Sequence, residues 1–207
     1  MPAKTAKRSY NSSRRTLQAA QTREEVLRAG TKLFAEKGWA GTTLAAIAEE
    51  AGVSVETIYK GFGSKKALLR EAMDMAVVGD AEPVAYIERS EFASLGEGTL
   101  AERARRGAAI VATINERSAG VWQAIVEAAS SDEEVAGWRL ELEANRRLDT
   151  HRSIERVLGR DVDENLVTLL WLLYSPETYR KLVVDSGMSR AEYESLLVDA
   201  GNRVMGF

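Results

Sequence analysis

The stretch from Thr43 to Phe62, with the sequence TLAAIAEEAGVSVETIYKGF, places the strongest constraint on how this chain can fold. Its first half has apolar residues at positions i, i+3, i+4 and i+7, which predicts a short amphipathic helix with an inner face of Leu44, Ile47, Ala48 and Ala51. Gly52 follows as the residue that most easily adopts the left-handed conformation at a helix C-terminus, and Ser54 is placed to cap a second helix. Two short helices joined by a tight turn that contains glycine form a helix-turn-helix, so we expect this stretch to bind DNA.

The net charge of −3 conceals two parts of opposite sign. Residues 1–70 contain 13 Lys and Arg and 6 Asp and Glu, whereas residues 71–207 contain 15 and 25, so the two parts carry +7 and −10. A positive part that also contains a helix-turn-helix is what binding to phosphates requires. The alternative, a charged surface that only faces solvent, does not explain why the positive charge coincides with the motif.

The rest of the composition predicts an all-α protein with a sizeable core. The chain has 207 residues, only three prolines and no long alternating β-branched run. It has no cysteine, which excludes disulfides, thiolate metal sites and a cysteine nucleophile and is compatible with a reducing cytoplasm. The N-terminus is polar and basic, unlike a signal peptide, and the most apolar run, residues 166–174, is shorter than the roughly 20 residues of a membrane helix. We therefore expect a soluble cytoplasmic protein without a metal or cofactor.

The segment Thr22–Met73 resembles the DNA-binding domain of the tetracycline-repressor (TetR) family of transcriptional regulators. The resemblance is carried, in order, by the segments TREEVL, LFAEKGW, TTLAAIAEEAGVSVETIYKGF and SKKALL. It implies an N-terminal three-helix domain with a helix-turn-helix, followed by a larger helical domain that binds ligand and dimerises. We accordingly divide the chain into a disordered basic arm (1–21), a DNA-binding domain (22–66) and an effector-binding and dimerisation domain (67–207).

Capping residues and glycines predict where several helices begin and end. Three pairs have the spacing of a capping box: Thr22 and Glu25, Ser131 and Glu134, and Ser189 and Glu192. Ser64 and Ser175 are further N-caps, the latter followed by proline at the first helical position. Gly38 is expected to end the first helix, residues 118–120 to interrupt a later one, and Val84–Phe92 to form a short helix in the least regular part.

The arm, residues 1–21, has five basic residues, no acidic one and little apolar content, so no ordered structure is expected for it. One hypothesis is that the arm follows the DNA backbone or enters a minor groove, as basic arms do. The other is that it is a solubilising tail. The sequence favours neither.

Nine residues are candidates for DNA contact: Thr42, Thr43, Ser54, Val55, Glu56, Thr57, Tyr59, Lys60 and Lys65. Thr43 combines a hydroxyl with the free N–H groups of a helix N-terminus, which together make a phosphate site, while Thr42 is either a second contact or an ordinary cap. In the second helix, the recognition helix, Val55 or Thr57 could contact a thymine methyl. Glu56 could accept a hydrogen bond from a cytosine amine or simply face solvent.

The resemblance implies phosphate contacts for Tyr59 and Lys65. Tyr59 would pack its ring under the recognition helix and reach a phosphate with its hydroxyl, the alternative being a core tyrosine. Lys60 is placed either for phosphate or for solvent. Gly61 departs from the family, which usually has histidine or another sizeable residue there, and it loosens the helix end by about 1 kcal/mol relative to alanine. We expect this departure to alter affinity or specificity without abolishing binding.

The C-terminal part is interpreted mainly through the resemblance. Two DNA half-sites lie about 34–36 Å apart, which demands a dimer, and in the family two C-terminal helices of each copy form the interface. Here this implies Leu158 and the stripe Tyr193–Val204, with packing inside one chain as the alternative. Six aromatic residues lie on helices that surround an effector cavity in the family, although each could be a core residue: Tyr86, Phe92, Trp122, Trp138, Trp171 and Tyr174. The single histidine, His151, cannot form a metal site by itself.

These observations favour a transcriptional regulator that binds double-stranded DNA, most simply a homodimeric repressor released from a palindromic operator by a partly apolar small molecule. The effector would act by moving the helix after Ser64. The alternatives are an activator on the same fold, or a helical interaction protein in which Gly61 has weakened DNA binding. An enzyme is disfavoured, because no H-E-x-x-H, P-loop, G-x-G-x-x-G or G-x-S-x-G motif occurs and a single histidine allows no histidine pair. We expect no membrane partner, and association with the nucleoid when DNA is bound.

Overall fold

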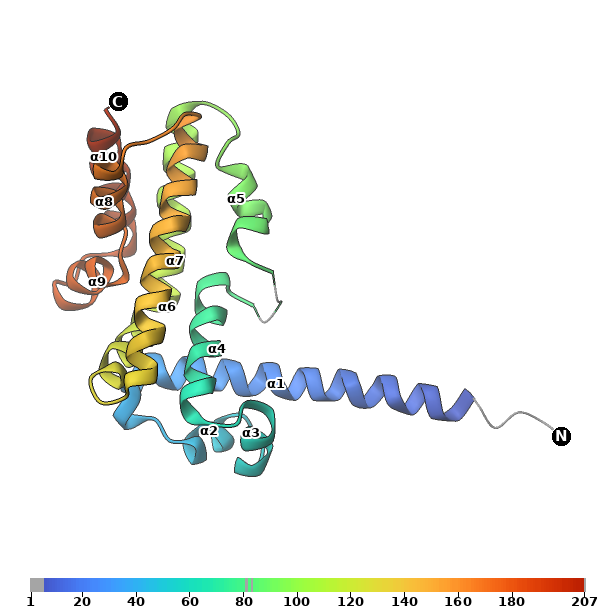
Figure 1. Ribbon diagram of the computed structural model, residues 1–207. Helices are drawn as coiled ribbons and strands as arrows, with labels where there is room; N and C mark the ends of the chain where they lie inside the picture. The colour runs from blue at the N-terminus through green and yellow to red at the C-terminus, as the bar shows by residue number, and fades with distance from the viewer. Residues whose placement is uncertain (1–5, 81, 83, 207) are drawn as a thin grey trace.

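The computed structural model describes residues 6–80, 82 and 84–206, and these form helices and loops without a β strand, as the sequence predicts. The helices are α1 Ala6–Gly41, α2 Leu44–Glu50, α3 Val55–Phe62, α4 Lys65–Val78, the 3-10 helix η1 Tyr86–Glu88, α5 Ser90–Ser94, α6 Leu100–Ala129, α7 Glu133–Leu158, α8 Glu164–Leu173, α9 Pro176–Tyr179, the π-helical segment η2 Arg180–Asp185 and α10 Arg190–Met205. Figure 1 shows α1 lying across the base with α2 and α3 beneath it, while α4, α6 and α7 run away from this base. The helices α8, α9 and α10 stand beside α6 and α7, on the side away from α5.

Four of the predicted helix starts are confirmed by the hydrogen bonds of their capping serines. In each case the serine hydroxyl accepts a backbone N–H at 3.1–3.2 Å, at Ser54, Ser64, Ser175 and Ser189. The turn between α2 and α3 is formed as predicted, because Gly52 has a φ of +66°. A short polar side chain before an apolar repeat therefore located these helices correctly.

The N-terminal part of α1 differs from the predicted disordered arm. Residues 6–21 are helical and continuous with the following segment, so the capping box at Thr22 does not begin a helix; residues 1–5 lie outside the described residues. The physical reason is that extending a helix already held by packing avoids the cost of nucleation, and the alanine, glutamine and arginine of this stretch are good helix formers. Gly38, with a φ of +67°, interrupts the regular helix where an end was predicted.

Gly120 was predicted to lie in a helix break, but α6 runs through it without interruption. A Cβ atom added there would lie 2.8 Å from the Cα, Cβ and carbonyl oxygen of Ala35 in α1. Real Cβ atoms do not approach a backbone this closely, so glycine is needed for the contact between α1 and α6. The glycine is therefore a packing residue of the interior rather than a helix terminator.

Two other predicted boundaries are displaced. The helix expected to begin at Ser131 is capped by Asp132, whose carboxylate accepts the N–H groups of Glu134 and Val135 at 3.0 and 3.2 Å. The short helix expected over Val84–Phe92 is divided into η1 and α5. In the first case a neighbouring polar residue takes the capping role, whereas neither η1 nor α5 begins with a side-chain cap.

The main apolar core joins the base to the upper helices. Its buried members come from six helices and include Phe34, Ile47, Ile58, Leu68, Val121, Ile125 and Val135. The domain boundary predicted at residue 66 falls at the beginning of α4, inside this packing. Motion of α4 is therefore mechanically linked to the helices on both sides of that boundary.

The stripe Tyr193–Val204, predicted as a dimer interface, is divided between the interior and the surface of its own chain: Leu196 and Ala200 are half-buried and Val204 is exposed. Tyr193 and Leu197 are fully buried against α6 and α9, and Leu158 packs beside the cluster formed by α7 and α8. The same helical spacing suits either kind of packing, so the sequence could not distinguish them. Large apolar side chains that remain exposed nearby are Leu169 and Leu172 on α8 and Val204 on α10.

Candidate DNA interface and ligand cavity

The helix-turn-helix brings most of the predicted DNA-contact residues onto one small exposed unit. The predicted contact residues that are exposed on α2, α3 and their caps are Thr43, Ser54, Glu56, Thr57, Tyr59 and Lys60. Tyr59 is 55% exposed, so it is not the core tyrosine that the sequence left open. The inner face of the same helix is held by Ile58 and Phe62, which are buried in the core. The unit therefore presents hydroxyl, carboxylate and ammonium groups on a fixed support.

The ends of the two helices have the polarity that an anion site needs. The Thr43 hydroxyl accepts the N–H of Ala46 at 3.1 Å, and the Ser54 hydroxyl accepts that of Thr57 at 3.2 Å. Hydrogen bonds from the backbone and from Ser54 lower the pKa of Glu56, so this exposed side chain is a carboxylate at neutral pH. Val55 is half-buried and packs against the core, which leaves only part of its side chain on the surface.

Thr42 is a correction to the predicted set. Its side chain is fully buried, and its hydroxyl donates to the carbonyl of Gly38 at 2.7 Å and lies 2.9 Å from that of Leu33. A hydroxyl engaged in this way cannot reach a phosphate without breaking the connector between α1 and α2. Thr42 holds that connector in place, and Thr43 is the member of the pair that reaches the surface.

Lys65 lies at the start of α4 but is directed toward the connector. Its ammonium donates to the carbonyl oxygen of Trp39 and lies 3.9 Å from the centre of the Trp39 ring. Partial burial lowers the pKa of Lys65, while the charge of Glu127 opposes this effect. Since an ammonium has three donors, the contact with Trp39 leaves capacity for a phosphate.

Arg23 is a residue of this unit that the sequence did not single out. Its guanidinium donates to the carbonyl oxygen of Gly61 at 2.7 Å, pairs with Glu71 of α4 and lies 4.2 Å from the centre of the Phe62 ring. These contacts fasten the C-terminal end of the recognition helix to α1 and α4. They join positions at least 38 residues apart, so no local pattern could have indicated them.

Two further contacts fasten the helix-turn-helix to the upper helices. The carboxylate of Glu127 in α6 accepts the N–H groups of Trp39 and Ala40 at 2.7 and 3.1 Å. Lys66 of α4 pairs with Glu134 and lies 3.4 Å from Asp132 at the start of α7. Hydrogen bonds to a charged group are stronger than neutral ones, so the base of the molecule is held to α6 and α7 by more than apolar packing.

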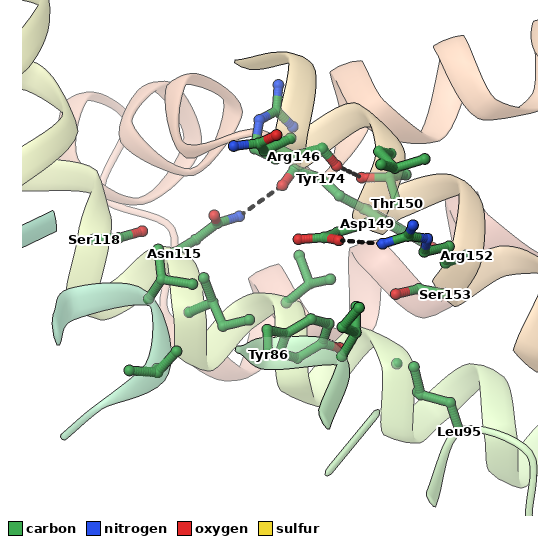
Figure 2. Close-up of a pocket in the computed structure, with 18 of the residues that line it drawn as sticks. Tyr86, Leu95, Asn115, Ser118, Arg146, Asp149, Thr150, Arg152, Ser153 and Tyr174 are labelled. Atoms are coloured by element: carbon green, nitrogen blue, oxygen red, sulfur yellow. Dashed lines mark hydrogen bonds and ion pairs between the residues drawn. The ribbon is translucent and has the colours of Figure 1, made fainter. Parts of the chain in front are cut away.

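A cavity of about 650 Å³ lies farther along α4, between this helix, α6, α7 and the segment from residue 84 to Leu95. Its lining is mostly apolar, with a few polar groups that Figure 2 shows converging on the space from different helices. Volume and lining of this kind are typical of small-molecule sites. The helix α4 contributes Met73, Asp74, Val77 and Val78 to the wall.

The structure brings three of the six predicted pocket aromatics to this cavity. Tyr86, Trp122 and Tyr174 line it, whereas the other three do not. Phe92 contacts Tyr86 edge-on from behind, with ring centres 5.7 Å apart. Trp138 packs against the main core, and Trp171 stacks under the guanidinium of Arg146 at 4.8 Å. Phe92, Trp138 and Trp171 therefore support or flank the site without forming its wall.

Several polar groups of the wall are already satisfied by the fold. The amide of Asn115 donates to the carbonyl of Tyr174 at 3.1 Å and lies 3.0 Å from the Tyr193 hydroxyl. The loop that carries Tyr86 is held by Arg89, whose guanidinium donates twice to Asp80 at 2.7 and 2.9 Å. These bonds hold the pKa of Asp80 at about 2. The wall is thus a formed surface with its shape set by internal contacts.

The N-terminal part of the chain is similar in sequence to known bacterial regulators. A profile of the family described as bacterial regulatory proteins, tetR family, matches residues 26–72. The uncharacterized HTH-type transcriptional regulator YerO of Bacillus subtilis is 41% identical over 54 residues, which is 26% of this chain and 19% of YerO. The HTH-type transcriptional regulator HbdR of Aromatoleum sp. is 45% identical over 49 residues, 24% of this chain and 21% of HbdR. The matched segment thus spans about a fifth of the length of these relatives.

Solved structures extend the likeness to the whole fold. A TetR-family regulator from Rhodococcus sp. superposes with a TM-score of 0.70 at 19% identity, covering 90% of this chain and 100% of the other. One from Mesorhizobium loti gives a TM-score of 0.64 at 24% identity, with coverage of 90% and 97%. At such identities the likeness concerns the fold alone.

The described part of the chain contains neither a membrane-spanning helix nor a cluster of metal ligands. No helix in it combines the length and the apolar character that crossing a bilayer would need. Across the same residues, no three acidic, histidine or cysteine side chains gather in a way that could hold a metal ion.

Proposed function

We propose that this chain, whose residues 26–72 match the tetR family of bacterial regulatory proteins, is a homodimeric repressor that leaves a palindromic operator when a small molecule enters its cavity. The observation that carries the proposal is the path of α4. This helix begins at Lys65, beside the recognition helix, and its last two turns form part of the cavity wall. One rigid element is therefore shared by the two sites.

DNA binding is proposed to use the exposed unit of α2 and α3. Thr43 and Lys65 would hold phosphates, and the first turn of α3, with Glu56 and Thr57, would contact base edges in the major groove. Tyr59, which is exposed on α3, would reach a phosphate with its hydroxyl. Phosphate contacts fix the position of the helix, and the few base contacts set the preferred sequence.

Release would follow from a shift of α4. A ligand that fits the cavity better in one position of Met73 and Val77 than in another favours that position, and without such a difference it changes nothing. Because Arg23 fastens α3 to α4 through Glu71, a displacement of α4 is passed to the recognition helix. The separation of the two recognition helices in the dimer would then no longer match one turn of DNA.

For the dimer we propose an interface centred on α8. Leu169 and Leu172 of this helix are each 53% exposed, and Val204 of α10 lies among the exposed apolar residues. A second copy covering these side chains would remove apolar surface from water. The buried stripe of Tyr193 and Leu197 would then support the interface from inside.

The test is a selection of genomic DNA fragments by the full-length protein, followed by sequencing and fluorescence-anisotropy titration of the enriched site. We expect a palindromic site bound with an affinity that falls steeply as salt rises, because several phosphates are neutralised per dimer. We expect the protein to act in the cytoplasm on nucleoid DNA. If no sequence is enriched, or if binding does not depend on salt, the proposal of a DNA-binding repressor is wrong.

A further inference from the structure

The charges on the cavity wall do not balance. Among the described residues that line the cavity, the charged ones are Asp74, Glu82, Arg146, Asp149 and Arg152. Toward the apolar cavity such charges are screened less than toward open solvent, to which Asp74, Glu82 and Arg152 are also exposed. Which of them remains unpaired therefore indicates the charge of the ligand.

Both arginines have carboxylate partners. Arg146 pairs with Glu143 at 2.8 Å and donates to the carbonyl oxygen of Trp171 at 2.7 Å, so its charge is used outside the cavity. Arg152 lies 3.8 Å from Asp149, and Figure 2 shows the Asp149 carboxylate between Asn115 and Arg152. The charge of each guanidinium is thus already shared with a carboxylate.

Within the described part of the chain, the side chain of Glu82 has no such partner, and Asp74 has none either. No hydrogen bond or ion pair joins its side chain to any residue that the structure describes. The charge of Arg70, one turn earlier on α4, acts on Asp74, but this side chain is directed to Glu141, at 3.3 Å, and to the ring of Trp138. Asp74 is exposed to solvent on one side, and the desolvation of its carboxyl group by the neighbouring apolar residues raises its pKa.

The rest of the wall suits an apolar body. Val111, Ile114, Leu142 and Ile154 of α6 and α7 line the cavity together with the rings of Tyr86 and Trp122. Aromatic faces attract cations as well as apolar groups. The wall thus combines an unpaired carboxylate on one helix with apolar and aromatic surface on two others.

We propose that the cavity takes an apolar organic cation, with its positive centre beside Asp74 and its apolar groups against α6 and α7. This inference deepens the proposed function and rests on it in one respect, the role of the ligand as effector. Asp74 stands on α4, so the attraction between ligand and protein acts directly on the helix that leads to the recognition helix. A neutral or anionic molecule of the same shape would lack this attraction.

The test uses two ions of nearly the same shape and opposite charge, tetraphenylphosphonium and tetraphenylborate. In calorimetric titrations of the full-length protein in potassium-free buffer, the cation should bind at least about tenfold more tightly than the anion. Asp74→Asn should remove most of that preference, and Asp74→Glu should retain it. Asp185→Asn, a matched change at an exposed carboxylate outside the cavity, should behave like the unaltered protein.

Equal binding of the two ions, tighter binding of the borate, or no binding of either would overturn the assignment, and these outcomes need no variant. So would an Asp74→Asn protein that melts normally and keeps the full preference. Release of DNA is measured separately, by anisotropy on the selected operator. If the cation binds as expected but leaves DNA affinity unchanged, the ligand class is supported and its role as effector is overturned. If a neutral molecule releases the DNA, the ligand class is overturned and the proposal of a repressor still stands.

Discussion

The helix-turn-helix and the cavity are built from different kinds of contact. In the helix-turn-helix, the caps at Thr43 and Ser54 bond to N–H groups three residues away, and the exposed groups follow one another within a single short segment. The cavity wall is assembled from positions as far apart as Met73 and Met205. The first is therefore a local structure that can keep its shape while the rest of the chain changes. The second depends on how several long helices pack, so its shape and ligand can change through many small substitutions.

This difference also explains how contacts between the two regions are made. They are joined by a few long-range bonds, from Glu127 to the connector and from Lys66 to the start of α7, together with the close approach at Gly120. Substituting individual residues shows which changes affect one region alone and which affect the coupling between the two regions.

The largest effect is expected from Gly120→Val, which inserts a branched side chain where a Cβ alone would lie 2.8 Å from the Ala35 backbone. We expect a loss of unfolding free energy on the order of 3 kcal/mol, because α1 and α6 must move apart. Thermal and urea unfolding measure it. Gly137→Ala is the matched control, since no atom lies within 4 Å of its added Cβ, and it should stabilise by up to about 1 kcal/mol. Similar midpoints for the two variants would contradict the packing role of Gly120.

The second largest effect is expected on DNA affinity, without a change in stability. Tyr59→Ala should weaken operator binding by about 2 kcal/mol, roughly 30-fold, and Lys60→Ala by less, with a reduction of the salt slope by about 1. Both side chains are exposed, so the unfolding free energy should stay nearly constant. Anisotropy titrations at several salt concentrations give both quantities, and Lys181→Ala on the exposed part of η2 is the control. An affinity unchanged by Tyr59→Ala would remove α3 from the proposed interface.

Glu127→Gln tests the connection between the regions. It keeps an acceptor for the N–H of Trp39 or Ala40 but removes the charge, so we expect a cost of about 1 kcal/mol in stability. Its main consequence should be that ligand changes DNA affinity several-fold less than in the unaltered protein. The coupling is obtained from four affinities, for DNA with and without ligand in both proteins, with the exposed Glu133→Gln as control. Full coupling in Glu127→Gln would show that the connector does not transmit the signal.

The smallest effect is expected from Gly61→Ala. The added Cβ has room, because the nearest atom is Arg23 Nη1 at 3.8 Å, and alanine favours the helix by up to about 1 kcal/mol. DNA binding should become slightly tighter as the end of α3 becomes more rigid. Weaker binding would mean that the backbone itself must approach DNA closely at this position.

The local structures were largely predictable from the sequence, and the long-range ones were not. Ser54 and Gly52 form the predicted cap and turn because their bonds lie within a few residues. Thr42 and Gly120 were misinterpreted, since their roles depend on α1 backbone that the sequence does not place beside them. A buried hydroxyl and an exposed one have the same local signature, and so do a glycine at a helix contact and one at a break.

For the cavity, the sequence identified only some of the residues that line the wall. Tyr86 and Trp122 line it as expected, whereas Trp138 faces the core and Trp171 lies under Arg146. Helical spacing indicates an apolar face but not which neighbour that face meets. Asp74 gave no signal at all, because an unpaired carboxylate is recognisable only when its surroundings are known.

The most direct test of the account is the distance between the two recognition helices of the dimer. Since the chain has no cysteine, Lys60→Cys provides a single site for a spin label on α3. In the ligand-free protein, pulsed electron-spin resonance should give a distance near one turn of DNA, about 34–36 Å. A ligand that calorimetry shows to fill the cavity should shift this distance away from that value, and the same shift should accompany the loss of DNA affinity. A distance that stays the same while the cavity is saturated would contradict the claim that α4 carries the signal from the cavity to the DNA.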